Sequence, residues 1–293
     1  MYLLWLSQPA CNDVMLVGGK VANLSRLSMD YAKHVPAGFC LTTSVFREWQ
    51  LDVTTFPPTI YDLLASAYDS LVEQCGDPRV AVRSSAVDED GQNLSFAGQY
   101  ETYLNLTGVE AVADAVLRRW AFARSARVEA YRRQRVQPNL ENQNDVSHIG
   151  LAVLVQQLVV ADMSAVVFSA NPVSGDQNEI VINATWGLGE SLVGGTVTPD
   201  TYIVRKSDLS IINRQVAEKQ RMTVLPHASR GTQEVRVPRF ISKRPAISDR
   251  QAIEMAQLAL TIENQMGWPV DLECAYRAEK LYLLQCRPIT TLK

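Results

Sequence analysis

The chain has 293 residues, of which 47% are hydrophobic and 20% are charged, and its formal net charge is -3. This composition fits a globular protein with a sizeable core, and the length suggests two domains or one large domain with lobes. The slightly acidic charge argues against a general nucleic-acid binder, which is usually basic overall. No apolar run approaches the roughly 18 residues that a transmembrane helix needs, so we expect no membrane span.

The chain contains five cysteines, and none of them forms a C-x-x-C pair. An odd number of unpaired cysteines favours buried free thiols in a reducing compartment, so we expect a cytoplasmic protein. The three histidines, His34, His148 and His227, are far apart in the sequence, and no H-E-x-x-H motif is present. A histidine-based metal site is therefore not expected.

The first elements can be read from apolar patterns and glycines. Residues 1–16 are apolar without a basic leader, which predicts a first strand and not a signal peptide. Residues 18–29 predict a glycine turn that leads into a short helix. The apolar side of this helix carries Val21, Leu24 and Leu27. Residues 35–42 predict a turn followed by a short strand, as in a loop that returns to a sheet.

Two further segments follow before residue 107. Residues 57–78 predict a helix, because prolines precede an apolar helical pattern that ends at Gly76. Residues 80–106 begin and end as strands, with a long polar segment between them that has Arg83 at its start and Gly98 near its end. Connections beyond about 12 residues are usually functional or disordered, so this segment calls for a functional explanation.

A longer helix is predicted for residues 108–135, with a buried stripe at helical spacing. The stripe consists of Val109, Val112, Val116, Trp120 and Ala123. The second half of this helix is rich in arginine, either because it forms a solvated face or because one or two arginines face a phosphate. These arginines are Arg118, Arg119, Arg124, Arg127, Arg132, Arg133 and Arg135.

The middle of the chain is rich in strand signals. Four strands are predicted at residues 151–160, 164–172, 179–190 and 200–206, and further short strands follow up to about residue 240. Near-continuous apolar runs in two of them indicate strands that are covered on both sides. A helix is then predicted at 248–267, because Ser248 and Gln251 form a capping box and Gly267 ends the pattern.

The last two strands form a predicted hairpin whose geometry can be derived from alternation. A turn centred on Glu279 places Glu273 opposite Gln285 and Asp271 opposite Arg287, with all four side chains on one face. The other face then has the composition of a core, with Leu272, Cys274, Tyr276, Tyr282 and Leu284.

The polar face of this hairpin has two interpretations. One is a surface face with a cross-strand ion pair between Asp271 and Arg287. The other is a cation and polyphosphate site, in which Glu273 and Gln285 supply oxygen ligands for Mg²⁺ and Arg287 pairs with a phosphate. Spacing alone does not decide between them.

Two glycine-containing segments differ from common nucleotide motifs. The sequence at 18–20 is GGK, but it lacks the first glycine of a Walker A loop, and Val21 follows the lysine. In GLGESLVGG, Leu192 stands where a dinucleotide fingerprint needs its third glycine. Lys20 nevertheless lies at a predicted helix start, where anions bind well.

Five segments occur together in a familiar order: VGGKVANLSRL, VPAGFCLTTSVF, VAVRSSAVDEDGQNLSFAGQYETYLNL, SANPVSGDQNEIVINATWGLGESLVGGTVTPDTYIV and DLECAYRAEKLYLLQCRPIT. Together they closely resemble the N-terminal nucleotide-binding region of the phosphoenolpyruvate synthase (pyruvate, water dikinase) and pyruvate, phosphate dikinase family. This family also contains rifampicin phosphotransferase. The resemblance covers nearly the whole chain.

The resemblance implies an ATP-grasp-like α/β fold with antiparallel or mixed sheets, flanking helices, and two lobes that clasp ATP and Mg²⁺. Residues 1–293 would form one ATP-binding region. Its N-terminal lobe would comprise residues 1–110 and carry the phosphate flap, and its second lobe would comprise residues 111–293 and end in the metal-binding hairpin.

The resemblance also implies roles for individual residues. Lys20 and Arg83 would contact the phosphates, and the FAGQYET segment would cover them as a flap through Gly98 and Thr102. Gln156 would lie near the base or ribose, because Gln157 would face the opposite way. The final hairpin would supply Glu273 and Gln285 as metal ligands. Lys20, Arg83 and Arg287 would be the catalytic cations.

Members of this family carry a phosphate from ATP to a histidine on a separate swivelling domain. His148 and His227 lack the glycine-rich lead of such a histidine and are expected to be structural. We therefore expect an ATP-dependent phosphotransferase of dikinase type that is incomplete without a phosphohistidine carrier. The alternatives are a freestanding ATP-dependent kinase or ligase acting on a small-molecule acceptor, and a non-catalytic ATP sensor. Besides ATP, the acceptor and the carrier, we expect no nucleic acid and no membrane as a partner.

Overall fold

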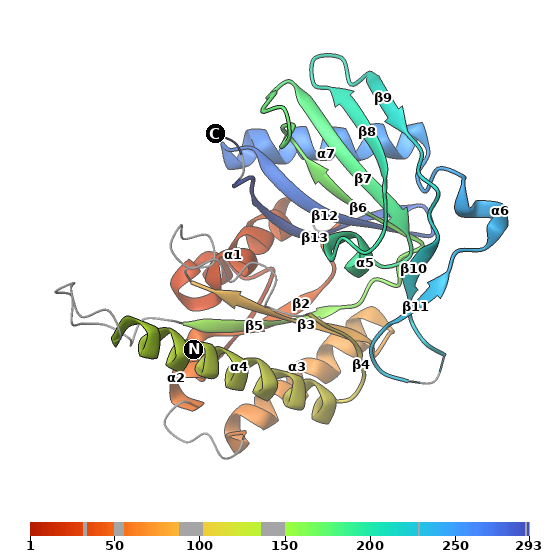
Figure 1. The fold of residues 1–293 in the computed structure, drawn as a ribbon. Coiled ribbons are helices and arrows are strands. Elements are labelled where there is room, and N and C mark those ends of the chain that lie inside the picture. Colours follow the sequence, from red (N-terminus) through yellow and green to blue (C-terminus); the bar gives the residue numbers. More distant parts are fainter. Residues whose placement is uncertain are drawn as a thin grey trace. The chain divides into compact units, whose positions relative to one another are not determined.

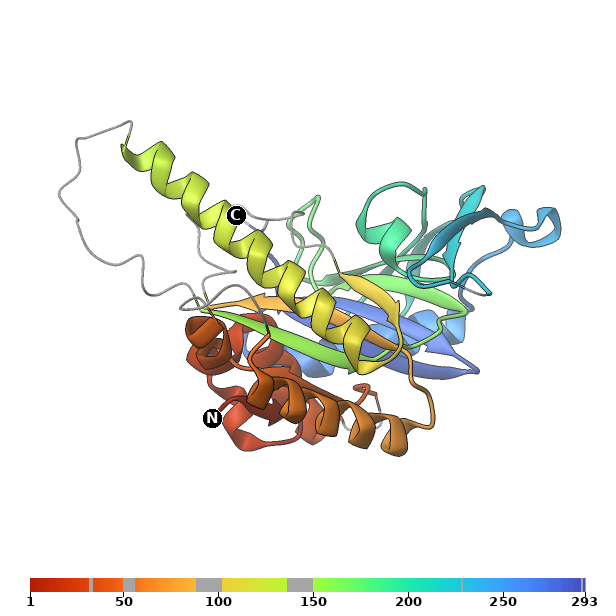
Figure 2. The same ribbon diagram turned by 90° about the horizontal axis from the view of Figure 1, so that it is seen from below.

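The structure is a computed structural model that describes residues 1–31, 34–49, 56–87, 102–135, 150–227, 229–290 and 292, without the side chains of 125–135. It divides into two compact units, and each is described by itself (Figures 1 and 2). The first unit comprises Met1–Arg26 and Ala37–Leu158, and the second comprises Leu27–Pro36 and Val159–Lys293.

The first unit contains a five-stranded antiparallel sheet in the order β1-β2-β5-β3-β4. Its strands are β1 Leu3–Trp5, β2 Gly38–Leu41, β3 Val80–Ala86, β4 Tyr103–Leu106 and β5 Leu151–Gln157. The helices are η1 Pro9–Asn12, α1 Val14–Asp30, α2 Thr43–Trp49, α3 Pro58–Cys75 and α4 Val109–Arg135. The last residues of α1 belong to the second unit.

One face of this sheet packs against α2, α3 and α4, which lie below it in Figure 1. Alternate residues such as Val82 and Val155 point into this core, and Val112, Val116 and Trp120 of α4 meet them, as the predicted stripe requires. The opposite face of the sheet therefore carries the side chains that alternate with them, including Arg83 and Gln156.

The beginning of the chain and the division into units differ from expectation. Only Leu3–Trp5 of the predicted opening strand is extended: a 3-10 helix follows at Pro9–Asn12, and a helix begins at Val14, where the side chain of Asp13 accepts the backbone N–H of Met15 at 2.9 Å. A division near residue 110 was expected. The structure groups α4 and β5 with the first unit, since β5 pairs with both β2 and β3.

The second unit contains a six-stranded antiparallel sheet in the order β13-β12-β6-β7-β8-β9 and a separate ribbon of β10 and β11. The sheet strands are β6 Met163–Phe168, β7 Glu179–Trp186, β8 Asp200–Arg205, β9 Ile211–Gln215, β12 Val270–Arg277 and β13 Lys280–Pro288. The ribbon strands are β10 Arg221–Val224 and β11 Gln233–Arg236. The helices are α5 Glu190–Val193, α6 Arg239–Ser242 and α7 Asp249–Met266.

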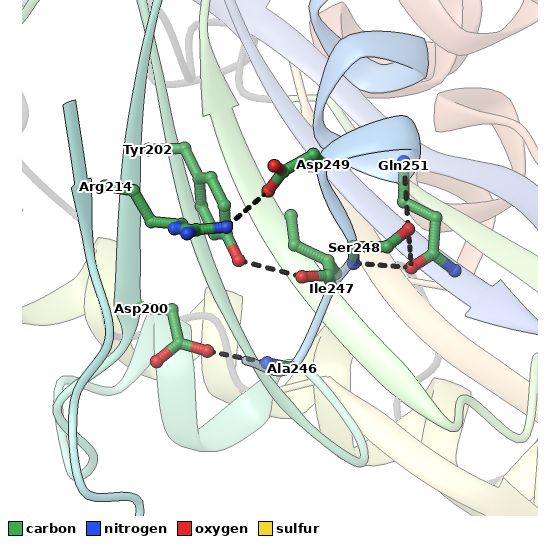
Figure 3. A network of polar contacts seen from close by, with 8 residues as sticks. All are labelled: Asp200, Tyr202, Arg214, Ala246, Ile247, Ser248, Asp249 and Gln251. Atoms are coloured by element: carbon green, nitrogen blue, oxygen red, sulfur yellow. Dashed lines mark hydrogen bonds and ion pairs between the residues drawn. The ribbon is translucent and has the colours of Figure 1, made fainter. Parts of the chain in front are cut away.

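Helix α7 covers one face of this sheet and contacts β6, β7, β8 and β12. It begins at the predicted capping box, where Ser248 accepts the backbone N–H of Gln251, and it ends at Gly267 in the left-handed conformation. Figure 3 shows how β8 and β9 hold its start: Tyr202 donates to the carbonyl of Ile247 at 2.8 Å, and Arg214 pairs with Asp249.

The carboxylate of Asp200, at the start of β8, completes this attachment. It accepts the backbone N–H of Ala246 at 2.7 Å (Figure 3), the backbone N–H of Ala217 at 2.9 Å, and the ammonium group of Lys219. Asp200 and Lys219 are both fully buried. The segment that joins β9 to β10 and the segment that leads into α7 are thus fastened to one strand.

All five cysteines are free thiols, and four of them are buried, as the sequence predicted. None of the helices in the described part of the chain combines the length and apolarity that a membrane span requires.

Candidate functional site

The segment that carries Lys20 is fixed against β3 by a break in α1. Gly18 has φ of 75°, and a Cβ placed there would lie 2.4 Å from Oγ of Ser85, so only glycine fits. After this break the helix restarts, and the hydroxyl of Ser85 accepts the backbone N–H of Val21 at 3.2 Å. A serine on the sheet therefore acts as the cap of the helical turn that begins around Lys20.

Arg83 and Gln156 lie on the same face of the sheet as Ser85. Arg83 precedes Ser85 by two residues on β3, and Gln156 pairs with Ala81 on the neighbouring strand. Gln156 is buried, whereas Gln157 points to the other face, as the sequence analysis expected. The first unit thus brings the Lys20 segment, Arg83 and Gln156 to one side of its sheet.

The expected flap lies largely outside the described residues. Gly98 is not among them, and Thr102 is a half-buried residue directly before β4. The next residue, Tyr103, contacts α4: the guanidinium carbon of Arg119 lies 4.2 Å from the centre of its ring.

Arg118 and Arg119 in the arginine-rich helix α4 have different environments. Arg118 is exposed and pairs with Asp114 at 2.9 Å, so it belongs to a solvated face. Arg119 is only 3% exposed and stacks on Tyr103. The signal for its burial was its position next to Trp120 on the apolar stripe. The side chains of Arg127, Arg132, Arg133 and Arg135 lie outside the described residues.

In the second unit, the hairpin of β12 and β13 has the predicted pairing at its polar end. Asp271 lies opposite Arg287, and Glu273 lies opposite Gln285. Their alternation places these four side chains on the face of the sheet that α7 does not cover, because the intervening Leu272 is buried on the α7 side.

The other end of the hairpin corrects the sequence analysis. Its turn consists of Ala278 and Glu279, both with positive φ, so Arg277 pairs with Lys280 and the pairing is offset by one residue. An irregularity in the register beside Glu273 and Cys274 adds one residue, Leu284, to β13 and restores the predicted pairs. Tyr282 and Leu284 are consequently half-buried and not in the core. The core face is formed instead by Leu281, Leu283 and Cys286.

Asp271 forms an ion pair with Arg287, with Nε of the arginine 2.7 Å from Oδ2 of the aspartate. The side chain of Asp271 is 7% exposed and that of Arg287 is 44% exposed. Burial raises the pKa of Asp271, the charge of Arg287 acts in the opposite direction, and Glu273 raises the pKa further. The second oxygen, Oδ1, is buried and has no hydrogen-bond partner in the described structure.

These oxygens fit a hard cation. Mg²⁺ is usually held by one or two protein carboxylates and completes its shell with water and phosphate oxygens. Glu273 and Gln285 face each other on adjacent strands, and the unpartnered oxygen of Asp271 lies on the same face. Within the described ranges, no three His, Cys, Asp or Glu side chains gather as a complete metal site. The donor set therefore suits a metal that arrives with oxygen ligands of its own.

A comparison with protein families shows which kind of domain contains the candidate residues of the first unit and of the β12–β13 hairpin. The family described as "Pyruvate phosphate dikinase, AMP/ATP-binding domain" matches residues 50–293. The chain belongs to this family. The resemblance seen in the sequence motifs is thereby confirmed.

Several relatives agree with this membership. Phosphoenolpyruvate synthase from Pyrococcus furiosus is 34% identical, over 100% of this chain and 44% of the relative. Rifampicin phosphotransferase from Streptomyces sviceus is 35% identical, over 99% of this chain and 36% of the relative. An uncharacterized phosphotransferase from Bacillus subtilis is 36% identical, over 98% of this chain and 35% of the relative. The chain thus spans less than half the length of these relatives.

Among solved structures, D-alanine–D-alanine ligase from Bacillus anthracis aligns with 98% of this chain and 60% of its own, with a TM-score of 0.38 and 8% identity. A likeness of this size does not assign a fold. The fold class that the structure itself shows is α/β, with antiparallel sheets and flanking helices in each unit.

Proposed function

We propose that the chain is the ATP-binding part of a dikinase-type phosphotransferase that passes a phosphoryl group from Mg·ATP to a histidine on a carrier domain. The observation that carries this proposal is the polar face of the β12–β13 hairpin. There, a buried and half-satisfied carboxylate, a second carboxylate, an amide and an arginine share one face in a member of an AMP/ATP-binding family.

In this proposal each cation has a defined task. Arg287 is held at Nε by Asp271 and presents its guanidinium group to the polyphosphate, while Arg83 and Lys20 contact the phosphates from the first unit. Mg²⁺, bound through Glu273 and Gln285, would supply charge stabilisation at the transferred phosphate. Phosphoryl transfer depends mainly on positioning and electrostatics, so these groups are the appropriate catalysts.

The remaining predicted residues bind the rest of the nucleotide in this proposal. Gln156 would hydrogen-bond the base or ribose from its buried position on β5, and Thr102 and Gly98 would cover the phosphates. The two units would act as the lobes of an ATP-grasp-like clasp. The carrier histidine and the final acceptor would belong to parts of the protein, or to partners, beyond this chain. The length of the relatives supports this, because they extend well beyond the region matched here.

Isothermal titration of the purified chain with Mg·ATP tests the proposal, with Arg83→Ala as the main variant. A hydrogen bond to a charged group is worth about 1.5–3 kcal/mol, so we expect affinity to fall at least tenfold. Arg79→Ala is the matched control, because Arg79 lies near the start of the same strand and pairs with Asp77, away from the candidate residues. An Arg83→Ala variant that binds Mg·ATP as tightly as the parent would contradict the assignment.

The nucleotide product distinguishes this proposal from the two alternatives. Incubation with Mg·ATP and a carrier domain that yields AMP fits dikinase chemistry, in which one phosphate of ATP stays on the histidine and a second is released to water or phosphate, whereas ADP alone indicates a simple kinase acting on a small acceptor. Tight binding without any turnover, even after addition of a carrier domain, indicates an ATP sensor.

A further inference from the structure

The polar face of the hairpin continues across the sheet of the second unit. Directly paired residues of antiparallel strands point to the same face, so a row can be followed from strand to strand. This row crosses β13, β12, β6, β7 and β8 at Gln285, Glu273, Val166, Asn183 and Thr201. Asn183 therefore shares its face with the candidate metal ligands, while its neighbours Ile182 and Ala184 are buried on the face toward α7.

Asn183 is held in one orientation by its partner on β8. The hydroxyl of Thr201 donates to Oδ1 of Asn183 at 2.9 Å. This bond occupies the amide oxygen and directs Nδ2, with its two N–H donors, away from Thr201. Both residues are half-buried. The described structure shows no acceptor for Nδ2, so the amide is available to a ligand oxygen.

Asn183 is an unusual residue for its place in the sequence, and stability of the strand does not explain it. The residue lies in the middle of β7, within the apolar run Ile180, Val181, Ile182 and Ala184. Asparagine is depleted in strands because it packs poorly there and competes for backbone hydrogen bonds. Two residues further along the same face, the hydroxyl of Thr185 is buried without a described partner, so this part of the face is polar as well. A ligand oxygen at the half-buried amide of Asn183 accounts for an asparagine at this position.

The distance between Asn183 and Glu273 can be spanned by one bound nucleotide. Neighbouring strands lie about 4.8 Å apart, so Asn183 is about 10 Å from Glu273, two strands away. An extended nucleoside triphosphate can reach from a metal ion at Glu273 to a donor at this distance. We propose that Asn183, positioned by Thr201, is a nucleotide-binding residue that donates a hydrogen bond to an oxygen of ATP. This inference rests on the proposed function and adds a residue to its site.

The test is titration with Mg·ATP of Asn183→Ala and Asn183→Asp, both checked for folding by thermal unfolding. We expect about tenfold weaker binding for Asn183→Ala, the size of one hydrogen bond to a charged acceptor. Asn183→Asp should weaken binding further, because it replaces the donor with acceptor oxygens and a negative charge. The exposed Asn178→Asp in the preceding loop adds the same charge and should leave affinity unchanged.

Thr201 is a positioning residue and has its own test. Thr201→Val removes the hydroxyl that orients the amide and should weaken Mg·ATP binding by less than Asn183→Ala does. Thr201→Ser keeps the hydroxyl and should restore the parent affinity. A role limited to packing would give the opposite order, since valine preserves the shape of threonine better than serine does.

Adenosine distinguishes the two sources of the oxygen. If Asn183 contacts the ribose, Asn183→Ala weakens adenosine and Mg·ATP alike; if it contacts a phosphate, only Mg·ATP is affected. The inference is overturned if folded Asn183→Ala and Asn183→Asp bind Mg·ATP like the parent while Arg83→Ala does not. Failure of the parent itself to bind Mg·ATP would instead overturn the proposed function, and this inference with it.

Discussion

Two aspartate–cation pairs lie on opposite faces of the sheet in the second unit, and they differ in how completely they are satisfied. Asp200 lies opposite Ala184 on the neighbouring strand, and its side chain therefore points to the face that α7 covers. It accepts hydrogen bonds from Lys219 and from two backbone N–H groups. Asp271 lies on the other face, where Arg287 satisfies one oxygen and the second has no described partner.

The pair of Asp200 and Lys219 therefore has a structural role, whereas the pair of Asp271 and Arg287 can still bind a ligand. A fully buried pair tolerates its desolvation when further hydrogen bonds satisfy the charged groups, as around Asp200, where both carboxylate oxygens have partners. A pair with one exposed cation and one unsatisfied oxygen keeps capacity for further charge. We therefore expect changes at the first pair to affect stability and changes at the second to affect ATP binding.

Lys219→Met should have the largest effect on stability. It leaves the carboxylate of Asp200 buried without its cation, which costs about 3–5 kcal/mol of unfolding free energy. Urea unfolding measures this loss. Arg214→Met is the matched control: its pair with Asp249 has side chains 49% and 58% exposed, and such surface pairs contribute at most about 1 kcal/mol. Equal losses in the two variants would remove the contrast between buried and open pairs.

Arg287→Ala should mainly reduce affinity for Mg·ATP, by about tenfold to a hundredfold, because it removes charge-assisted hydrogen bonds to phosphate. Its unfolding free energy should fall by less than that of Lys219→Met, because Asp271, which is 7% exposed and loses its cation, already has a raised pKa and can take up a proton. Calorimetric titration and urea unfolding measure the two quantities on the same samples. Arg277→Ala, which breaks an exposed pair with Asp162 at the other end of the hairpin, should not alter affinity. A larger loss of stability than of binding would assign Arg287 to the fold.

In the protein without nucleotide, Asp271→Asn should produce the smallest effect on stability, a change in how stability depends on pH. Burial raises the pKa of Asp271 in the folded state, so the folded chain binds this proton more tightly than the unfolded chain. The contribution of this group is then most favourable below its unfolded pKa of about 3.9 and declines as the pH rises through its folded pKa. Asp271→Asn removes that decline. Urea unfolding at several pH values between about 4 and 7 measures the difference from the parent, and an unchanged slope would contradict the direction of the shift.

The helices and the polar end of the hairpin could be predicted from the sequence because local signals determine them. The capping box at Ser248 and the glycine stop at Gly267 define α7 in the structure as they do in the sequence. The pairs Asp271–Arg287 and Glu273–Gln285 follow from strand alternation and were predicted correctly. The roles of Lys20, Arg83 and Gln156 in binding ATP stay predictions.

Other features depend on packing between distant segments, which sequence patterns do not reveal. The extra residue Leu284 in β13 gives no local signal, so Tyr282 was assigned to the wrong face. The stacking of Arg119 on Tyr103 requires the contact between α4 and β4. Asn183 was missed because its significance comes from its position in register with Glu273, two strands away.

The irregularity at Leu284 also limits how the protein can vary in length. Between the turn and Gln285, β13 has one residue more than the paired segment of β12. This extra residue keeps Gln285 opposite Glu273 and Arg287 opposite Asp271. A deletion of one codon there would rotate both side chains into the apolar interior, although no ligand residue had been changed. This short stretch is therefore intolerant of single-residue insertions and deletions.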